Sequence, residues 1–489
     1  MQSLVGSTAN RDPDGVAEEA RPGHVGFDPQ RPSFCLQGER EKIDAERARA
    51  LFTPLRDASI ATTSGTEADP SFERVSLSGK SFDVEAAGVA AEHIALLRPG
   101  SVRYLQLADV IAGQSEIEAL QVLELLAAAF AAHQVVELDL SDNALGAKGV
   151  RACAALFQRS ERLESLILCN NGLAADAIKL IVDALTGSEK RVYLKKLHLF
   201  NNLLKDEGAL ALVPLIERAP LLEDFRFASL RVSRGGSIAV AEALTRVAPT
   251  LRRLDMTDNV IGKDGAKALA QLLEQQTHLE ELYLRDCLLT DAGARCILEA
   301  LMRQTEQPRL RVLDLSGNEL IGAATGSLLG KFLEHCAPTL THLRLDENEL
   351  GDGGALAIAN ALARDPQRFR LVELSLYLND IGGRAAFMLV QRCVRIASMC
   401  VLNLNGNRLG CIALEHIERL VAGTPLASSF VDLDENNESE DEDATSDIFQ
   451  QLRIVEGSDS AEAEAEADAI TAQLHDLQVT TAPNASEAS

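Results

Sequence analysis

The chain has no tryptophan, few aromatic residues and no excess of positive charge. Aromatic residues make up 4% of its 489 residues, and its formal net charge is −26. Proteins that bind single-stranded nucleic acid stack bases on exposed rings, and proteins that bind duplexes or anionic membranes present basic surfaces. The composition therefore argues against nucleic acid and membrane surfaces as partners and favours a basic protein partner.

Long apolar runs and cysteine motifs are also missing. The longest apolar stretch, around residues 122–132, is interrupted by Glu124 and is far shorter than the roughly 18 residues of a membrane span. The N-terminus has no apolar segment typical of a secretory signal. Nine cysteines occur without a CxxC pair or a zinc-ligand spacing, which is typical of reduced thiols. We therefore expect a cytoplasmic protein without membrane insertion.

Motifs of self-contained catalysis are absent as well. Gly326–Lys331 resembles a P-loop only superficially, because the spacing is wrong and Phe332 stands where Ser or Thr is required. The sequence has no HExxH, no GxSxG and no GxGxxG after a predicted strand. Its nine histidines are scattered and predicted to be surface or packing residues. We expect no cofactor and no metal site, and a protein that promotes a reaction only through another protein's active site.

An internal repeat predicts the fold. The pattern L-x-L-x-x-N begins at residues 138, 166, 197, 313, 343, 374 and 402, and variants begin at 225, 254 and 282. Successive copies start 28–31 residues apart, and two degenerate copies begin at Val75 and Leu105. About twelve leucine-rich repeats are therefore predicted, stacked as an α/β solenoid with a ribonuclease-inhibitor-like horseshoe shape.

Each repeat predicts a strand, a turn and a helix. Leucines at i and i+2 of a short strand point into the core, and the following Asn satisfies the backbone of the turn and forms a ladder between repeats. Cys287 fills the Asn slot once and can donate only weakly. In residues 264–273, apolar residues recur at helical spacing. Aspartates such as Asp291 and Asp352 are predicted to cap the first helical turn.

Two other regions flank the repeats, which are predicted to occupy residues 73–425. Residues 1–33 hold Pro, Gly and charge without periodicity and are expected to be disordered. Residues 34–72 are expected to form a helical lead-in that caps the first repeat, with a helix beginning at Glu39. Residues 426–489 are predicted to form an acidic, mostly disordered tail.

The position before the Asn slot is a candidate partner-binding edge, because the strand passes into the turn there. It holds four acidic residues and no base across the repeats. Residue by residue this is an ordinary solvated rim, but as a row it suits a basic protein surface. Asn170 and Asn201 stand out, because each precedes a ladder Asn and the repeat itself does not require an amide there. The candidate contacts near this edge are Asp142, Asn143, Asn170, Asn201, Asp258, Asp286 and Glu347.

Several blocks resemble the Ran GTPase-activating proteins, with a pattern closest to the plant branch. They are residues 106–157, 222–236, 251–270 and 402–410, with a similar lead-in and a similar acidic tail. The resemblance covers roughly residues 35–480. It implies a protein that binds the small GTPase Ran in its GTP form and stimulates GTP hydrolysis in the cytoplasm, which supports nucleocytoplasmic transport.

The resemblance also implies how such a site works. Family members supply no arginine to Ran's active site and instead stabilise Ran's own glutamine, which orients the attacking water. The family's edge asparagine near that glutamine falls on Asn170 here. Because Ran holds GTP and Mg²⁺, this chain is expected to need no cofactor and not to be an enzyme itself. A monomer is expected, with Ran-GTP as partner and a Ran-binding protein as an optional third component.

One position departs from the family. Where the family has an arginine, this chain has Gln114, a candidate partner contact, which keeps hydrogen-bonding capacity but loses the charge and the planar fork. Lys148 and Arg151 are nearby in sequence and are candidates to compensate. Residues 1–33 show no plant targeting motif, which implies a diffusible cytoplasmic form, with association at the nuclear envelope left open. The alternative function is a non-catalytic leucine-rich-repeat scaffold or inhibitor that binds another protein.

Overall fold

The structure is a computed structural model that describes residues 32–63, 72–187, 191–247, 250–304 and 308–430. Most of the predicted disordered N-terminus and nearly all of the acidic tail lie outside these residues. The chain divides into two compact units. One contains the residues up to Leu320 together with His335–Leu345, and the other contains Ile321–Glu334 together with the residues from Asp346 onward.

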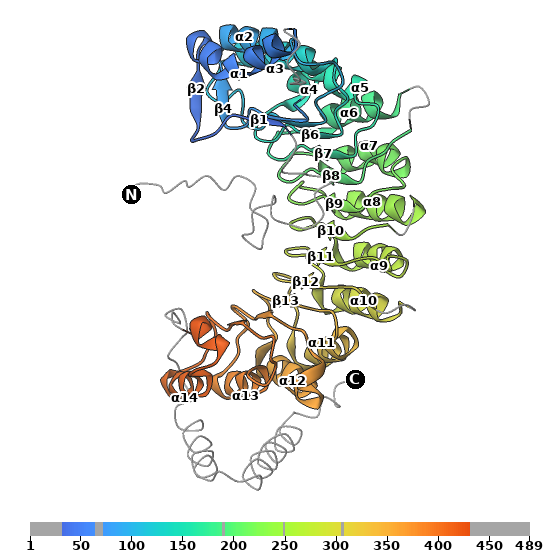
Figure 1. The fold of residues 1–489 in the computed structure, drawn as a ribbon. Helices are drawn as coiled ribbons and strands as arrows, with labels where there is room; N and C mark the ends of the chain where they lie inside the picture. Colours follow the sequence, from blue (N-terminus) through green and yellow to red (C-terminus); the bar gives the residue numbers. More distant parts are fainter. Residues whose placement is uncertain (1–31, 64–71, 188–190, 248–249, 305–307, 431–489) are drawn as a thin grey trace. The chain divides into compact units, whose positions relative to one another are not determined.

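The first unit stacks strand–turn–helix repeats along one parallel sheet (Figure 1). The strand order follows the chain, β1-β3-β5-β6-β7-β8-β9-β10-β11-β12-β13. The strands are β1 (Ser33–Cys35), β3 (Arg74–Ser76), β5 (Tyr104–Gln106), β6 (Glu137–Asp139), β7 (Ser165–Ile167), β8 (Lys196–His198), β9 (Asp224–Arg226), β10 (Arg253–Asp255), β11 (Glu281–Tyr283), β12 (Val312–Asp314) and β13 (His342–Arg344). A separate pair joins β2 (Glu41–Ile43) to β4 (Lys80–Phe82).

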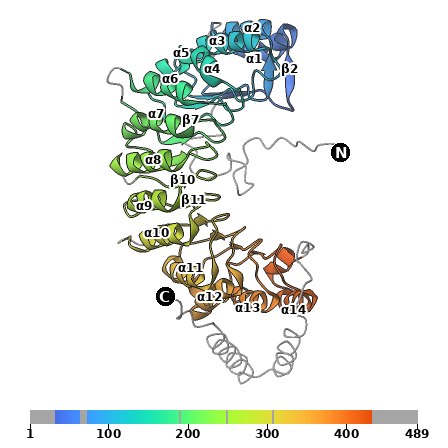
Figure 2. The same ribbon diagram turned by 180° about the vertical axis from the view of Figure 1, so that it is seen from behind.

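The helices of this unit follow the strands, as predicted. They are α1 (Ala45–Thr63), α2 (Val84–Ile94), α3 (Glu116–Phe130), α4 (Gly146–Ala152), α5 (Ala154–Arg159), α6 (Ala175–Thr186), α7 (Lys205–Glu217), α8 (Arg234–Val247), α9 (Gly262–Leu273) and α10 (Thr290–Met302). Strand leucines lie in register, with Leu138 beside Leu166, and both are fully buried. The core therefore lies between the sheet and the helices, which cover one face of it (Figures 1 and 2).

The second unit continues the same repeat pattern. It contains most of α11 (Gly322–Cys336), whose last two residues belong to the first unit. It also contains α12 (Gly351–Arg364), η2 (Pro366–Arg368), β14 (Glu373–Ser375), α13 (Gly383–Cys393), β15 (Val401–Asn403), α14 (Cys411–Val421) and η3 (Pro425–Phe430). Strands β14 and β15 pair in parallel, with Leu374 beside Leu402. The prediction of a leucine-rich-repeat α/β fold is confirmed.

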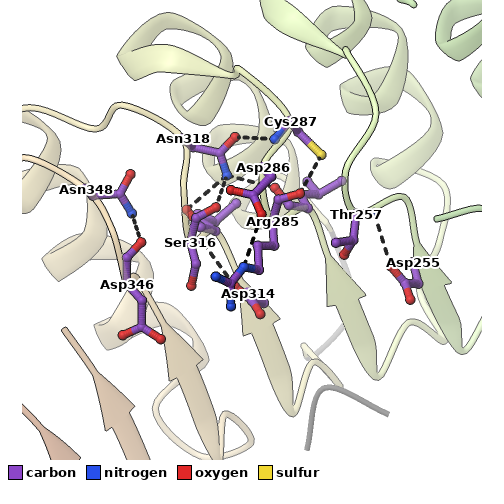
Figure 3. A network of polar contacts seen from close by, with 12 residues as sticks. Asp255, Thr257, Arg285, Asp286, Cys287, Asp314, Ser316, Asn318, Asp346 and Asn348 are labelled. Carbon is purple, nitrogen blue, oxygen red and sulfur yellow. Dashed lines mark hydrogen bonds and ion pairs between the residues drawn. The ribbon is translucent and has the colours of Figure 1, made fainter. Parts of the chain in front are cut away.

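The asparagine ladder has the predicted geometry. Asn171 Oδ1 accepts from the backbone N–H of Asn143 at 3.1 Å, and its Nδ2 donates to Leu140 O at 3.0 Å. Asn202 makes the same contact in the next repeat, where its Oδ1 accepts from Asn171 N at 3.1 Å. In the slot of β11, the Cys287 thiol donates at 3.3–3.5 Å to two backbone carbonyl groups (Figure 3). The buried turn groups are thus satisfied by the next repeat.

The predicted capping role of the helix aspartates is wrong. The helices begin earlier, so Asp291 and Asp352 lie within the first turns of α10 and α12, whose N-cap residues are leucines without side-chain caps. Acidic side chains still favour that end of the helix dipole. Asp352 Oδ1 instead accepts from Gly382 N in the next repeat at 2.6 Å. Asp206 accepts likewise from Ser233 N at 2.7 Å. These carboxylates tie successive repeats together.

The lead-in differs from the predicted single helix. Residues 41–43 form β2, because they pair with β4 and the buried Lys80 donates to Glu39 O at 2.6 Å. The helix begins only at Ala45. Its residue Phe52 packs on Phe34 of β1 with ring centroids 5.3 Å apart. The lead-in therefore adds strand β2 beside β4 and helix α1 beside α2.

Candidate functional site

The edge position before the ladder slot has a left-handed backbone in every repeat. Its φ is 61° at Asp142, 55° at Asn170 and 53° at Asn201. Asn, Asp and Gly tolerate this region best, so the backbone favours an amide there. Leu378 nevertheless adopts the same conformation, with φ 51°. The backbone therefore favours Asn at position 170 without requiring it.

Three edge side chains are hydrogen-bonded across successive repeats. Asn201 Nδ2 donates to Asn170 Oδ1 at 2.8 Å, and Asn170 Nδ2 donates to Asp142 Oδ1 at 2.7 Å. Asn201 is exposed, whereas Asn170 and Asp142 are half-buried. Each Asn170 side-chain group is thus engaged once within the described residues, which leaves one N–H and one lone pair for a partner. The carboxamide is held in one orientation at the edge.

The row continues toward the N-terminus through Asp109. This residue occupies the same left-handed edge position, with φ 56°, in the degenerate repeat that begins at Leu105. Arg40 Nη2 lies 2.5 Å from Asp109 Oδ1. Burial raises the pKa of Asp142, the hydrogen bond from Asn170 opposes this, and the charges of Asp109 and Arg40 act in opposite directions. We call Asp109, Asp142, Asn170 and Asn201 the rim row.

Sequence reasoning missed two members of this neighbourhood. Asp109 could have been found by extending the edge position to the degenerate repeat of β5. Arg40 had no such signal, because it lies outside the repeats and reaches the row only through the pairing of β2 with β4.

Gln114 has a structural contact. Its Nε2 donates to Phe82 O at 2.9 Å, and its side chain is half-buried. It therefore holds the loop before α3 against β4. Of the two cations considered as replacements for the family arginine, Lys148 pairs with Glu116 at 2.6 Å on the exposed faces of α4 and α3, and Arg151 lies exposed on α4.

The other candidates fall in three different environments. Asn143 is only 1% exposed and bonds to turn backbone, so the structure assigns it to the ladder rather than to a partner surface. Asp258 and Asp286 are exposed and help to line a groove of about 380 Å³, and Asp286 pairs with Arg285 at 3.2 Å (Figure 3). Glu347 is exposed in the second unit.

Two features are absent from the described part of the chain. None of its helices has the length and apolarity needed to cross a membrane. Nor do three His, Cys, Asp or Glu side chains come together there in a way that could hold a metal ion.

The fold is that of a leucine-rich-repeat solenoid. The family described as "Leucine Rich repeat" matches residues 133–152, 192–213, 247–270, 275–298 and 336–359. These segments carry strands β6, β8, β10, β11 and β13, so sequence and structure agree on the repeat unit.

Curated relatives of two kinds share these repeats. The chain is 34% identical to ribonuclease inhibitor of Mus musculus over 196 residues, 40% of this chain and 41% of that protein. It is 34% identical to RAN GTPase-activating protein 1 of Arabidopsis thaliana over 157 residues, 32% and 26% of the two chains. Identity to RAN GTPase-activating protein 2 of the same plant is 37% over 130 residues, 27% and 22% of the two chains. The chain thus spans less than half the length of each.

Among solved structures, a TLR13–ssRNA13 complex aligns with 69% of this chain and 46% of its own, at 15% identity and a TM-score of 0.36. That score is too low to support an argument.

Proposed function

We propose that this chain is a GTPase-activating protein for the small GTPase Ran and that it acts through the rim row. The observation that carries the proposal is the carboxamide of Asn170, held by Asn201 and Asp142 at an accessible edge. The similarity to two Arabidopsis RAN GTPase-activating proteins supports Ran as the partner. The two candidate functions differ in whether this edge only binds or also orders a partner's catalytic group.

The proposed mechanism is positioning. Asn170 hydrogen-bonds Ran's own catalytic glutamine, which then holds the attacking water in line with the γ-phosphate. No arginine is inserted by this chain, and GTP and Mg²⁺ are bound by Ran. Because Asn170 is already oriented by two hydrogen bonds, little of its own freedom is lost when the partner binds. Each tenfold acceleration requires about 1.4 kcal/mol of transition-state stabilisation.

The remaining proposals concern the cellular setting. The chain acts as a monomeric regulator in the cytoplasm, where lowering Ran-GTP supports nucleocytoplasmic transport. The exposed carboxylates of Asp258 and Asp286 attract a basic face of the partner and raise the association rate.

The test is single-turnover GTP hydrolysis by Ran with increasing amounts of this protein. The informative variant is Asn170→Gly, because glycine keeps the left-handed backbone while removing the amide. We expect a large acceleration by the wild-type protein and its near-complete loss in Asn170→Gly. Gln114→Arg should leave the rate unchanged or raise it, provided that the loop before α3 stays in place. No acceleration at saturating protein would refute the proposal.

A second candidate function is a non-catalytic inhibitor or scaffold. The ribonuclease inhibitor of Mus musculus favours it, because that match covers more of this chain than either RAN GTPase-activating protein does. Adding this protein to a ribonuclease assay separates the two. The inhibitor function predicts loss of ribonuclease activity at stoichiometric protein, and the activator function predicts none.

A further inference from the structure

Two positive side chains lie on a segment outside the repeats, and one of them, Arg40, reaches the rim row at Asp109. Arg40 lies immediately before β2, and its side chain is 65% exposed although it pairs with Asp109. Lys42 lies on β2, and its Nζ is 3.5 Å from the place that a Cβ on Gly113 would occupy. Within the described residues Lys42 is exposed and has no hydrogen-bond or ion-pair partner. Both side chains are therefore accessible to a second molecule.

The backbone that carries these cations is firmly held. Strand β2 pairs with β4 in a parallel register that places Glu41 beside Lys80. The Lys80 side chain, 3% exposed, lies 3.5 Å from the Glu41 carboxylate and donates to Glu39 O at 2.6 Å. Arg47 Nε donates to Glu41 Oε1 at 2.7 Å from the first turn of α1. The segment on both sides of Arg40 is thus anchored to the first repeat (Figures 1 and 2).

The positive charges of Arg40 and Lys42 are opposite in sign to those of the acidic edge positions. Asp109 and Asp142 carry carboxylates at these edge positions, as do Asp258 and Asp286 further along the first unit. A basic partner that met only these acids could slide from repeat to repeat, because the edge positions repeat with the same geometry. A cation at one end breaks that repetition. A partner then gains most when it places an acidic group at that end.

We infer that Arg40 and Lys42 form a docking site for an acidic side chain of the partner GTPase and so set the register in which the partner meets Asn170. This inference rests on the proposed function. A carboxylate fits better than a nucleotide triphosphate, because Asp109 already neutralises part of the Arg40 charge. The guanidinium fork also matches a carboxylate with two parallel hydrogen bonds.

The test compares charge reversals on two faces of the first unit. The variant is the double substitution Arg40→Glu and Lys42→Glu. Its matched control is the double substitution Arg159→Glu and Lys179→Glu. The control makes the same change in net charge at exposed positions of helices α5 and α6. Single-turnover hydrolysis by Ran gives two quantities for each, the concentration for half-maximal stimulation and the rate at saturation. Thermal unfolding checks that each variant folds.

We expect the variant to need about tenfold more protein for half-maximal stimulation at low salt, which corresponds to about 1.4 kcal/mol of binding free energy. Its rate at saturation should stay within about twofold of the wild type, and the control should shift little. Lys42→Glu alone should also raise the protein concentration needed for half-maximal stimulation. Among the described residues Lys42 has no hydrogen-bond or ion-pair partner, so that effect would not come from a lost hydrogen bond or ion pair among them.

Other outcomes overturn the inference in distinguishable ways. A variant that behaves like its control shows that the two cations do not touch the partner, while the activation proposal stands. A fall in the saturating rate with unchanged half-maximal concentration assigns Arg40 to the nucleotide phosphates instead. A wild-type protein that neither binds nor stimulates Ran-GTP removes the proposed function and this inference together.

Discussion

The Asn170 carboxamide donates to the Asp142 carboxylate across the boundary between two repeats, with Nδ2 2.7 Å from Oδ1. The same amide accepts from Asn201 in the following repeat. A side chain at the edge is therefore oriented by its neighbours on both sides as well as by its own backbone. A change at either neighbour should therefore alter the orientation of the Asn170 carboxamide.

Asn201→Gly tests this coupling. Glycine keeps the left-handed backbone at position 201 but removes the donor to Asn170 Oδ1. We expect the stimulated rate at saturation to fall by about three- to tenfold, since one net hydrogen bond contributes about 1 kcal/mol. Ser229→Gly is the matched control, because Ser229 has the same φ of 53°. An Asn201→Gly protein as active as the control would show that Asn170 needs no neighbour.

Protonation of Asp142 should change the side-chain amide resonances of Asn170. Burial raises the pKa of Asp142, so its midpoint should lie above the ordinary value of about 3.9. Below that midpoint the carboxylate becomes a weaker acceptor, and the side-chain amide resonances of Asn170 should shift. Asp109→Asn should lower the midpoint, because the Asp109 charge raises the pKa of Asp142. An amide signal that does not change with pH would contradict the hydrogen bond.

The raised pKa of Asp142 also predicts how the free energy of unfolding changes with pH. Because the folded-state pKa is raised, the folded protein holds the Asp142 proton more tightly than the unfolded chain does. This contribution to the free energy of unfolding is complete below the unfolded pKa and is lost as pH rises through the folded pKa. Denaturant unfolding of the wild type and of Asp142→Asn, at pH values from below the unfolded pKa to above the folded pKa, measures this contribution. A contribution that grows with pH would contradict the raised pKa.

How far the sequence predicted this molecule depends on whether a feature repeats. The strand leucines and ladder asparagines recur at fixed spacing, so the repeat starts were predictable to the residue. The left-handed edge backbone was not recognised, because Leu378 and Ser229 hide the preference that the asparagines reveal. Strand β2 was missed because three residues carry no period, and its pairing depends on the distant Lys80.

The asparagine ladder predicts opposite effects for two substitutions. Asn171→Ala should lower the free energy of unfolding by about 2–4 kcal/mol, because Asn143 N and Leu140 O lose their partner in a buried turn. Cys287→Asn should raise it by about 1 kcal/mol, because an amide replaces a weak thiol donor in the same slot. Denaturant unfolding measures both, with Cys287→Ala as the control for removing the thiol. A destabilising Cys287→Asn would show that this slot has adapted to sulfur.

Cysteine reactivity should divide according to burial. Burial raises the pKa of Cys153, Cys336 and Cys393 to about 12, so these thiols hold their protons and are shielded from reagents. Cys400 and Cys411 are exposed. Alkylation near pH 7.5 followed by mass spectrometry should therefore modify the exposed pair first, and the buried three only after denaturation. Early modification of Cys153 in the folded protein would contradict its placement.

The acidic tail predicts an effect on association rather than on the chemical step. Residues 432–489 hold 17 acidic residues and one basic residue, a formal charge of −16. Deleting them should slow association with a basic partner at low salt, because long-range attraction raises encounter rates, and the difference should shrink as salt screens it. Stopped-flow mixing with Ran-GTP at two salt concentrations measures this, and a tail with its acids changed to Asn and Gln is the control for length. The saturating rate should be unaffected, since the rim row lies within residues 109–201. A deletion that abolished stimulation at saturation would place part of the activating machinery in the tail.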